Sequence, residues 1–321
     1  MSARAEPSVV PKDFVSLADW PREALEQILA RARELKELRR KGVPVRTLEG
    51  RSIALYFEKP SLRTHVTFEV GVFELGAHPV FLPPGQVRLG SRESVADVAR
   101  NLSRWCHGLV ARTFSHALVE ELASNAAIPV INALTDDLHP CQAMADALTV
   151  AEHGDLRRVR LVYLGNGNNV ACSLIHLAGR LGLRLTICTP TELRPSEETV
   201  RWGVEAARQE GGELRLETDP GKAVRDADFL YTDTWYDMGE ESNADERRAL
   251  LRPYQINAEL LALAPAQARV LHCQPAHPGD EITAEVMGAD ESLVFEQAAN
   301  RLHTQKAILE VLVMPPPGTR A

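Results

Sequence analysis

Two hydroxyl residues and an arginine stand shortly after an apolar run near the start of the chain. The run Ile53–Phe57 is typical of a buried strand, and Ser61, Arg63 and Thr64 follow it where a helix is expected to begin. The first turn of a helix offers free backbone N–H groups and the positive end of the helix dipole, and an arginine adds a charge-assisted fork. The segment therefore predicts a cradle for a phosphate-like anion, although the same residues would also suit a simple helix cap beside a solvated arginine. It is not a P-loop, because the pattern G-x-x-x-x-G-K-[ST] is absent.

Three more polar residues stand at the ends of predicted elements. Arg112 closes the apolar run Leu109–Ala111, and His139 and Gln142 open a long helical segment. Because ligands bind at the carboxyl ends of the strands in an open parallel sheet, we expect these residues and Arg63 to converge on one pocket. Taken alone, His139 is more typical of a capping or packing residue.

A glycine-containing loop and a cysteine allow further interpretations. Residues 164–170 follow a strand and open a helix, as in dinucleotide-binding proteins, but Val170 stands in place of the third glycine. No acidic residue closes the next strand, Leu185–Cys188, where ribose recognition needs one. Cys273 could be a thiol nucleophile, yet a buried cysteine at a strand end is usually a packing residue, and no clear general base accompanies it.

Strand-like apolar runs alternate with helical periodicity along most of the chain, which predicts parallel sheets covered by helices on both faces. The predicted strands are residues 53–57, 79–82, 109–111, 128–131, 160–164, 183–188, 228–232 and 269–271. The predicted helices include residues 94–105, 139–153, 197–209 and 300–313. A domain junction is expected between the end of the long helical segment and the run that begins at Arg160.

The composition limits the class of protein. A length of 321 residues suits two domains, and 45% hydrophobic and 25% charged residues are ordinary for a soluble globular protein. A net charge of -8 argues against a nucleic acid as the main partner, so any anion must be held by a local cluster of cations. Five scattered cysteines without a C-x-x-C pair fit reduced thiols in the cytoplasm. We find no apolar run of signal-peptide or membrane-spanning length and expect no membrane partner.

Five ordered motifs resemble those of the aspartate/ornithine carbamoyltransferases, and the resemblance spans nearly the whole chain. The motifs are S-L-R-T at 61–64 with Arg112, H-P-C-Q at 139–142, D-T-W-Y-D-M-G at 233–239, H-C-Q-P at 272–275 and N-R-L-H at 300–303. The resemblance is closest to the ornithine-specific members, because the aspartate-specific members differ around Asp233 and Cys273.

The resemblance implies an α/β fold with two doubly wound parallel-sheet domains of similar size, an active-site cleft between them and helices that link them. Residues 1–150 would bind carbamoyl phosphate, with the C-terminal segment 300–321 packing back on them, and residues 151–299 would bind ornithine. The implied reaction transfers the carbamoyl group of carbamoyl phosphate to the side-chain amine of L-ornithine and gives L-citrulline and phosphate, in arginine metabolism. No metal ion or other cofactor is required.

The same correspondence implies roles for individual residues. Those expected to bind carbamoyl phosphate are Ser61, Leu62, Arg63, Thr64, Arg88, Arg112, His139, Gln142, Cys273, Gln274 and Arg301. Within this set Arg112 and His139 would lie near the carbonyl, and Cys273 would position the reacting groups without a covalent intermediate. Those expected to bind ornithine are Asn169, Asp233, Asp237 and Met238.

Several positions depart from the commonest ornithine-specific pattern. They are Leu62 for a threonine, His65 for a second arginine, Gln274 for a leucine and Asp237 for a serine. Arg88 falls where a glutamine from a neighbouring subunit often reaches carbamoyl phosphate, and Gln86 lies close to it in the sequence. We therefore expect segment 86–93 to complete the site of an adjacent subunit, and the resemblance implies a homotrimer or an assembly of trimers.

Three other functions remain open at the level of sequence. The amine could be different from ornithine, such as putrescine or an N-acylated ornithine, because Asp237 and Gln274 depart from the ornithine pattern. The chain could be a catalytically silent family member that binds metabolites or partners, although it retains the arginines, the histidine and the cysteine of the motifs. A nicotinamide-dependent oxidoreductase would rest on Gly165-Asn166-Gly167 alone.

Overall fold

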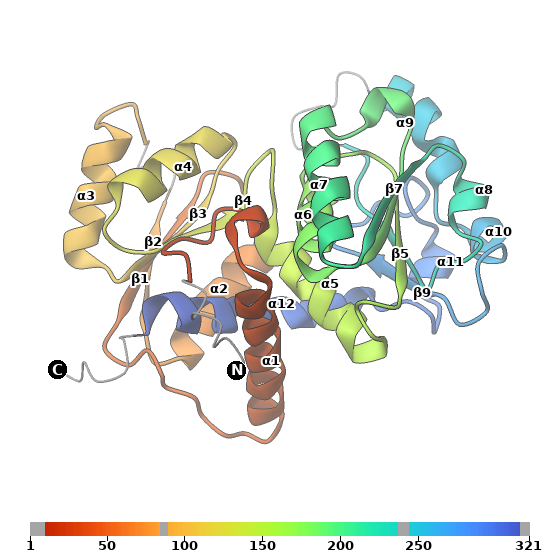
Figure 1. Ribbon diagram of the computed structural model, residues 1–321. Helices are drawn as coiled ribbons and strands as arrows, with labels where there is room; N and C mark the ends of the chain where they lie inside the picture. Colours follow the sequence, from red (N-terminus) through yellow and green to blue (C-terminus); the bar gives the residue numbers. More distant parts are fainter. Residues whose placement is uncertain (1–9, 84–88, 237–243, 315–321) are drawn as a thin grey trace, which may run out of the picture. The chain divides into compact units, whose positions relative to one another are not determined.

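The computed structural model describes residues 10–83, 89–236 and 244–314 and divides the chain into two compact units (Figure 1). Unit 1 comprises the residues up to Met144 together with those from Asn300 onward, and unit 2 comprises Ala145–Ala299. The chain passes from one unit to the other twice, each time within a helix, α5 (Pro140–His153) and α12 (Val294–Val313).

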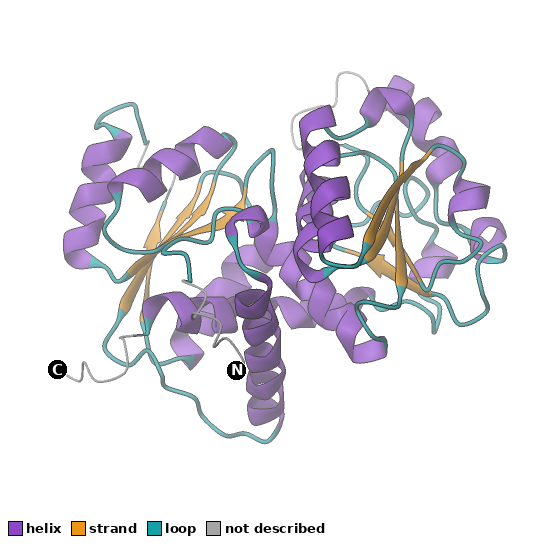
Figure 2. Ribbon diagram, in the orientation of Figure 1, coloured by secondary structure: helices purple, strands orange, loops and turns teal. Residues whose placement is uncertain are grey.

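Unit 1 is built on a four-stranded parallel sheet in the order β2-β1-β3-β4. Its strands are β1 (Ser52–Phe57), β2 (His78–Leu82), β3 (Gly108–Arg112) and β4 (Val130–Leu134), and its other helices are α1 (Arg22–Arg40), α2 (Leu62–Glu74), α3 (Val95–Trp105) and α4 (His116–Asn125). Helices lie on both faces of the sheet (Figure 2). Alternate strand residues such as Tyr56 and Ala111 pack with Leu102 and Leu122 of the covering helices α3 and α4. Strands β1, β3 and β4 are buried, which explains their apolar runs, whereas the edge strand β2 is partly exposed.

Unit 2 is built on a five-stranded parallel sheet in the order β7-β6-β5-β8-β9. Its strands are β5 (Arg160–Leu164), β6 (Arg184–Cys188), β7 (Glu213–Glu217), β8 (Phe229–Thr232) and β9 (Arg269–His272), and its helices are α6 (Asn169–Leu181), α7 (Glu197–Gln209), α8 (Pro220–Ala223), α9 (Ala244–Leu251), α10 (Ala258–Leu261) and α11 (Ala284–Met287). One core joins Val162, Leu230 and Val270 of the strands to Ile282 and Val286 of the segment that follows β9.

The structure confirms the predicted fold class, because every pairing between named strands is parallel and both sheets are covered by helices. Several elements differ from the prediction. Strand β4 covers Val130–Leu134 instead of residues 128–131, and helices α8 to α11 were not predicted. Strand β7 was not predicted, because its alternating sequence E-L-R-L-E is that of a half-exposed edge strand. Helix α12 begins at Val294, earlier than the predicted residue 300. Within the described ranges, no helix is long and apolar enough to cross a lipid bilayer.

Each sheet has one point where the strand order reverses. In unit 1 it lies between β1 and β3, and in unit 2 between β5 and β8. The last residues of the strands at these points are paired in register, Phe57 with Arg112 and Leu164 with Thr232. Because loops diverge there, such points are where open α/β sheets bind ligands. Most of the residues predicted to form the site end or follow these four strands or β9, whereas His139 and Gln142 follow β4 and Arg301 lies on α12.

Candidate functional site

Helix α2 begins in unit 1 with the residues predicted to form the anion cradle. Ser61 is its N-cap, and the Ser61 hydroxyl oxygen accepts a hydrogen bond from the backbone N–H of Thr64 at 3.2 Å. Thr64 is buried, Arg63 is partly exposed and the Leu62 side chain points to solvent with 73% of its surface exposed. The cap leaves the hydroxyls and the guanidinium on the first turn, so the cradle is preformed, and Leu62 can contribute its backbone N–H to it.

The hydroxyl of Thr64 brings together two arginines that are far apart in the sequence. Arg301 on α12 donates from Nη2 to Thr64 Oγ1 at 2.9 Å, and Arg112 at the end of β3 approaches the same oxygen from Nη1 at 3.5 Å. Arg301 also donates from Nη1 to Gln142 Oε1 in the first turn of α5. Four of the predicted site residues therefore meet in unit 1, and all four are buried.

This cluster of cations is unusual for a protein interior. Within residues 10–83, 89–236 and 244–314, no carboxylate forms an ion pair or hydrogen bond with Arg112, although its side chain is only 9% exposed. Burial, and then the charges of Arg301 and Arg63, lower the pKa of Arg112 to about 9. A buried charge without a counter-ion is unfavourable, so the site is electrostatically prepared for an anion.

His139 lies beside the same cations and is buried. Burial, followed by the charges of Arg301 and Arg112, holds the pKa of His139 well below the ordinary value of 6.5. Its imidazole is therefore neutral at pH 7. It can donate one N–H to a carbonyl oxygen without adding a further positive charge to the cluster.

In unit 2, Asn168 organises the loop between β5 and α6. Its Oδ1 accepts from the backbone N–H groups of Val170 and Ala171 and so caps α6, while its Nδ2 donates to Asp233 Oδ2 at 2.7 Å. A side chain on Gly167 would place a Cβ 2.3 Å from a backbone oxygen of Leu193. The glycine at 167 thus has a packing reason that needs no dinucleotide.

Asp233 follows β8 and receives three hydrogen bonds. Besides Asn168, the backbone N–H of Thr234 and the thiol of Cys273 both donate to Asp233 Oδ1 at 2.8 Å. Burial, followed by the negative charge of Asp233, raises the pKa of Cys273 well above 9. Cys273 is therefore a protonated hydrogen-bond donor at neutral pH and a poor nucleophile. Asn169 is the first residue of α6 and follows Asn168 directly in the sequence. Its side chain is buried.

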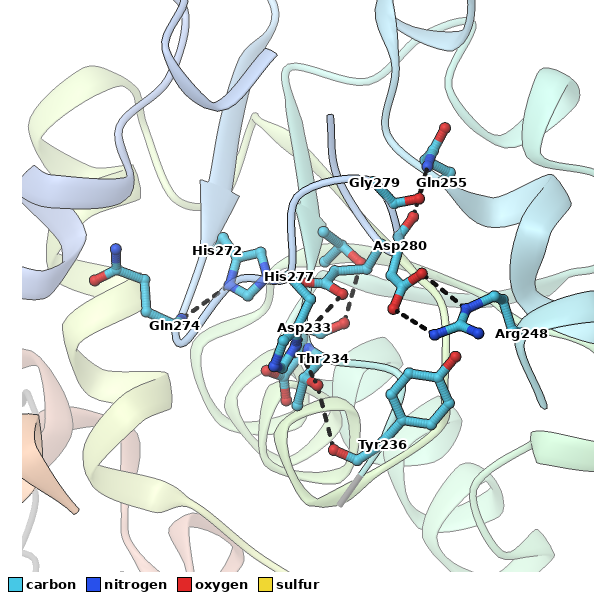
Figure 3. A network of polar contacts seen from close by, with 12 residues as sticks. Asp233, Thr234, Tyr236, Arg248, Gln255, His272, Gln274, His277, Gly279 and Asp280 are labelled. Atoms are coloured by element: carbon cyan, nitrogen blue, oxygen red, sulfur yellow. Dashed lines mark hydrogen bonds and ion pairs between the residues drawn. The ribbon is translucent and has the colours of Figure 1, made fainter. Parts of the chain in front are cut away.

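The turn after Cys273 is held by its neighbour His272. The backbone N–H of Gln274 donates to His272 Nδ1 at 2.8 Å (Figure 3). His272 Nε2 lies 3.0 Å from Glu281 Oε1. Asp233, His272 and Cys273 each offer a ligand atom, and these atoms lie within 4.8 Å of one another. Both ring nitrogens of His272 are already engaged, so the imidazole has no lone pair left for a metal ion, and the cluster fits a hydrogen-bonded site better than a metal centre.

Three predicted residues, Arg88, Asp237 and Met238, lie outside the described residues, as does Gln86. Conversely, Asn168, His272 and Glu281 belong to the observed cluster but were not predicted. Asn168 carried a local signal, since asparagine before a helix is a preferred N-cap. Glu281 carried none, because its partner His272 is reached only through the folded loop.

Comparisons with known proteins agree across the whole chain. The model of the carbamoyl-P binding domain of aspartate/ornithine carbamoyltransferase matches residues 12–152, and that of the Asp/Orn binding domain matches residues 157–312. The chain is 43% identical over 307 residues to the ornithine carbamoyltransferase of Thermococcus kodakarensis, covering 95% of this chain and 98% of that protein. It is also 43% identical to the anabolic ornithine carbamoyltransferase of Pyrococcus furiosus, with the same coverage. The solved structure of ornithine carbamoyltransferase from Pyrococcus furiosus superposes with a TM-score of 0.93 at 42% identity and covers 98% of this chain and 100% of that one.

Proposed function

The chain belongs to the aspartate/ornithine carbamoyltransferase family, and on this premise we propose that it transfers the carbamoyl group of carbamoyl phosphate to the side-chain amine of L-ornithine. The products are L-citrulline and phosphate, as in the biosynthesis of arginine. The observation that carries the proposal is the buried cation Arg112, which meets Arg301 at Thr64 and has no carboxylate partner among the described residues. A dianionic phosphate group would supply a counter-charge for Arg112.

Unit 1 is the proposed site of carbamoyl phosphate. The first turn of α2, with Ser61, Arg63 and Thr64, would hold the phosphate oxygens through hydroxyls, backbone N–H groups and the guanidinium. Arg112 and the neutral His139 would donate to the carbonyl oxygen of the substrate. These donors are fixed before the substrate arrives, so they stabilise the oxyanion of the transition state without reorganising.

Unit 2 is the proposed site of ornithine. The carboxylate of Asp233, oriented by Asn168 and Thr234, would receive an ammonium group of the amino acid. Asn169 would bind the substrate carboxylate from the first turn of α6, where the positive end of the helix dipole favours an anion. The protonated thiol of Cys273 would orient the attacking amine, and no covalent bond to sulfur forms.

The reaction proceeds by attack of the amine nitrogen on the carbonyl carbon. The side-chain amine of ornithine is protonated at neutral pH, so the site must bind it in, or convert it to, the neutral form before attack. The nitrogen forms a bond to carbon, and the carbonyl electron pair moves to oxygen. This pair then returns to re-form the carbonyl, while the bond from carbon to the phosphate oxygen breaks and its electron pair leaves with the phosphate. The amine proton passes to a phosphate oxygen, which leaves as inorganic phosphate.

The proposal extends to assembly and location. The protein would work as a homotrimer or an assembly of trimers, in which segment 86–93 reaches the site of the next subunit; residues 84–88 lie outside the described part of the chain. Its five cysteines form no disulfide with one another, which supports a reducing compartment such as the cytoplasm. Sedimentation of a fully active monomer would refute the proposed assembly.

The direct test is an assay of phosphate release and of ureido product with carbamoyl phosphate and a panel of amines. The panel contains L-ornithine, putrescine, N-acetylornithine and L-aspartate. We expect the highest kcat/KM with ornithine, and a loss of about 10²- to 10³-fold in Arg63→Ala, the range found when one oxyanion donor is removed. Absence of turnover with every amine indicates a silent family member, and preference for putrescine overturns the choice of substrate.

A further inference from the structure

The residue after Cys273 has an unusual backbone conformation. Gln274 has a φ of 60°, in the left-handed region, which residues other than glycine rarely adopt. Such a conformation persists only where surrounding contacts hold it. The contact in this case is the hydrogen bond from the Gln274 N–H to His272 Nδ1, at 2.8 Å.

This hydrogen bond settles the state of the histidine ring. Because Nδ1 accepts a hydrogen bond from a backbone N–H, it carries no proton, and the proton of the neutral ring is on Nε2. His272 Nε2 then donates to Glu281 Oε1 at 3.0 Å, and both side chains are fully buried. The same Oε1 accepts the backbone N–H of His277 from farther along the loop. The Gln274 N–H thus fixes the tautomer, and Glu281 accepts the Nε2 proton and holds the orientation of the His272 ring.

The backbone of His272 is held independently of its ring. Its N–H donates to Gln297 Oε1 at 2.8 Å, and Gln297 in turn donates from Nε2 to the buried Asp146 at 2.7 Å. Although the backbone of His272 is fixed by this hydrogen bond, its imidazole ring can still rotate about the side-chain bonds. Glu281 is the side chain that removes this freedom.

The neighbouring carboxylate has a different role. Asp280 turns toward the outside of the loop and pairs with Arg248 on α9 at 2.9 Å (Figure 3). Consecutive acidic residues thus face opposite directions, one toward an exposed cation and one toward a buried imidazole. A solvated surface acid needs no explanation, whereas a fully buried carboxylate hydrogen-bonded to a neutral ring does.

We infer that Glu281 is a positioning residue for Cys273: through His272 it holds the left-handed turn at Gln274, and this turn keeps the Cys273 thiol on Asp233. The inference rests on the proposed function insofar as the thiol orients the attacking amine. Loss of the Glu281 acceptor frees the imidazole to rotate, releases the Gln274 N–H and lets the thiol leave the carboxylate. The effect is expected in the ornithine-dependent step.

The test compares Glu281→Ala with Glu281→Gln, since glutamine keeps an oxygen that can accept from both His272 and His277. We expect Glu281→Ala to lower kcat/KM for ornithine by about 10- to 100-fold, as for loss of a buried hydrogen bond, and Glu281→Gln to stay within about threefold of the wild type. A second readout needs no substrate. The rate at which iodoacetamide alkylates Cys273, followed by peptide mass spectrometry, is expected to rise by at least about tenfold in Glu281→Ala and to change little in Glu281→Gln, because only alanine leaves the turn unheld.

Val286→Ala is the matched control for general loss of stability. Val286 is buried in the core of unit 2, which also contains Ile282, the residue after Glu281. Its apolar side chain takes no part in the hydrogen bonds that join Glu281, His272 and Gln274. We expect it to lower the melting temperature while both readouts stay within about threefold of the wild type. The inference would be overturned if Val286→Ala and Glu281→Ala changed kcat/KM and the alkylation rate equally. It would also be overturned if Glu281→Ala left both quantities unchanged, or if Glu281→Gln changed them as much as Glu281→Ala. A wild-type protein without turnover would refute the proposed function instead, and the alkylation rates would still decide the role of Glu281.

Discussion

Replacement of Arg112 by glutamine is expected to stabilise the ligand-free protein and to weaken its binding of phosphate. Burial, then the charges of Arg301 and Arg63, lower the pKa of Arg112 to about 9, so the folded state disfavours the charged form that the unfolded chain prefers. For a cation with a depressed pKa, this destabilisation is fully present below about pH 9 and fades as the pH rises above it toward the ordinary pKa of an arginine in the unfolded chain. At pH 7 the folded protein therefore carries the whole penalty.

The size of the effect follows from the pKa of Arg112. The fall of the pKa of Arg112 from its ordinary value to about 9 corresponds to about 5 kcal/mol at 1.36 kcal/mol per pH unit, which is an upper bound. Glutamine loses the long contact with Thr64 and some packing, which offsets about 2 kcal/mol. The net gain in the free energy of unfolding is about 2–3 kcal/mol, or about 4–12 °C in melting temperature for a domain of this size.

The assay is thermal unfolding at pH 7 in a buffer without phosphate, repeated with inorganic phosphate. Phosphate should raise the melting temperature of the wild type more than that of Arg112→Gln, because the stabilisation by a ligand grows with its affinity. The matched control is Arg31→Gln, since Arg31 forms a two-pronged ion pair with the buried Glu310. Arg31→Gln leaves the buried carboxylate of Glu310 without its cation and should lower the free energy of unfolding by about 2–4 kcal/mol. This change is opposite in sign to that expected for Arg112→Gln.

Two results would refute this reasoning about Arg112. One is an Arg112→Gln protein that is less stable than the wild type without phosphate, which would mean that the guanidinium is compensated in the folded state. The other is an equal increase in melting temperature with phosphate for both proteins, which would mean that Arg112 does not face the anion.

Three further predictions concern other polar side chains. Burial and the nearby Lys36 and Lys306 lower the pKa of His303 to about 4. As the pH falls from 6.5 to 4, the unfolded chain takes up the proton before the folded protein does, so the free energy of unfolding should fall by up to about 3 kcal/mol. Urea unfolding of His303→Leu should show a smaller change of this free energy with pH than the wild type. Cys273→Ser keeps a donor to Asp233 and should retain about tenfold more kcat/KM than Cys273→Ala, and equal losses would argue against a hydrogen-bonding role. Asn168→Ala loses a helix cap worth about 1 kcal/mol and a partner of Asp233, so both the melting temperature and the affinity for ornithine should fall; an unchanged KM would separate the cap from the substrate site.

Much of the fold is readable from local patterns. The strands buried on both faces, such as β1 and β5, have continuous apolar runs, and they were predicted within one residue of their observed bounds. The edge strand β7 was not, because a half-exposed strand with glutamates and an arginine has no such run. The family predicted from ordered motifs is confirmed by matches over residues 12–152 and 157–312.

Some features of the site are likewise determined by local sequence, and others depend on tertiary contacts. Residues in the first turn of a helix, such as Ser61 and Thr64, have a chemistry that local sequence determines, because capping and free N–H groups depend on neighbours in the chain. The state of a side chain is different. His139 is neutral because it is buried beside two arginines, and one of them, Arg301, lies on a helix at the far end of the sequence.

Sequence alone thus established the residue types, their order and the class of sheet that carries them. Tertiary structure decided which arginines lie in one place, which imidazole is neutral, and that Glu281 meets the His272 ring beside Cys273. The physical reason is that periodicity and capping act over a few residues, whereas desolvation and Coulomb interactions act between groups that only folding brings within a few ångströms.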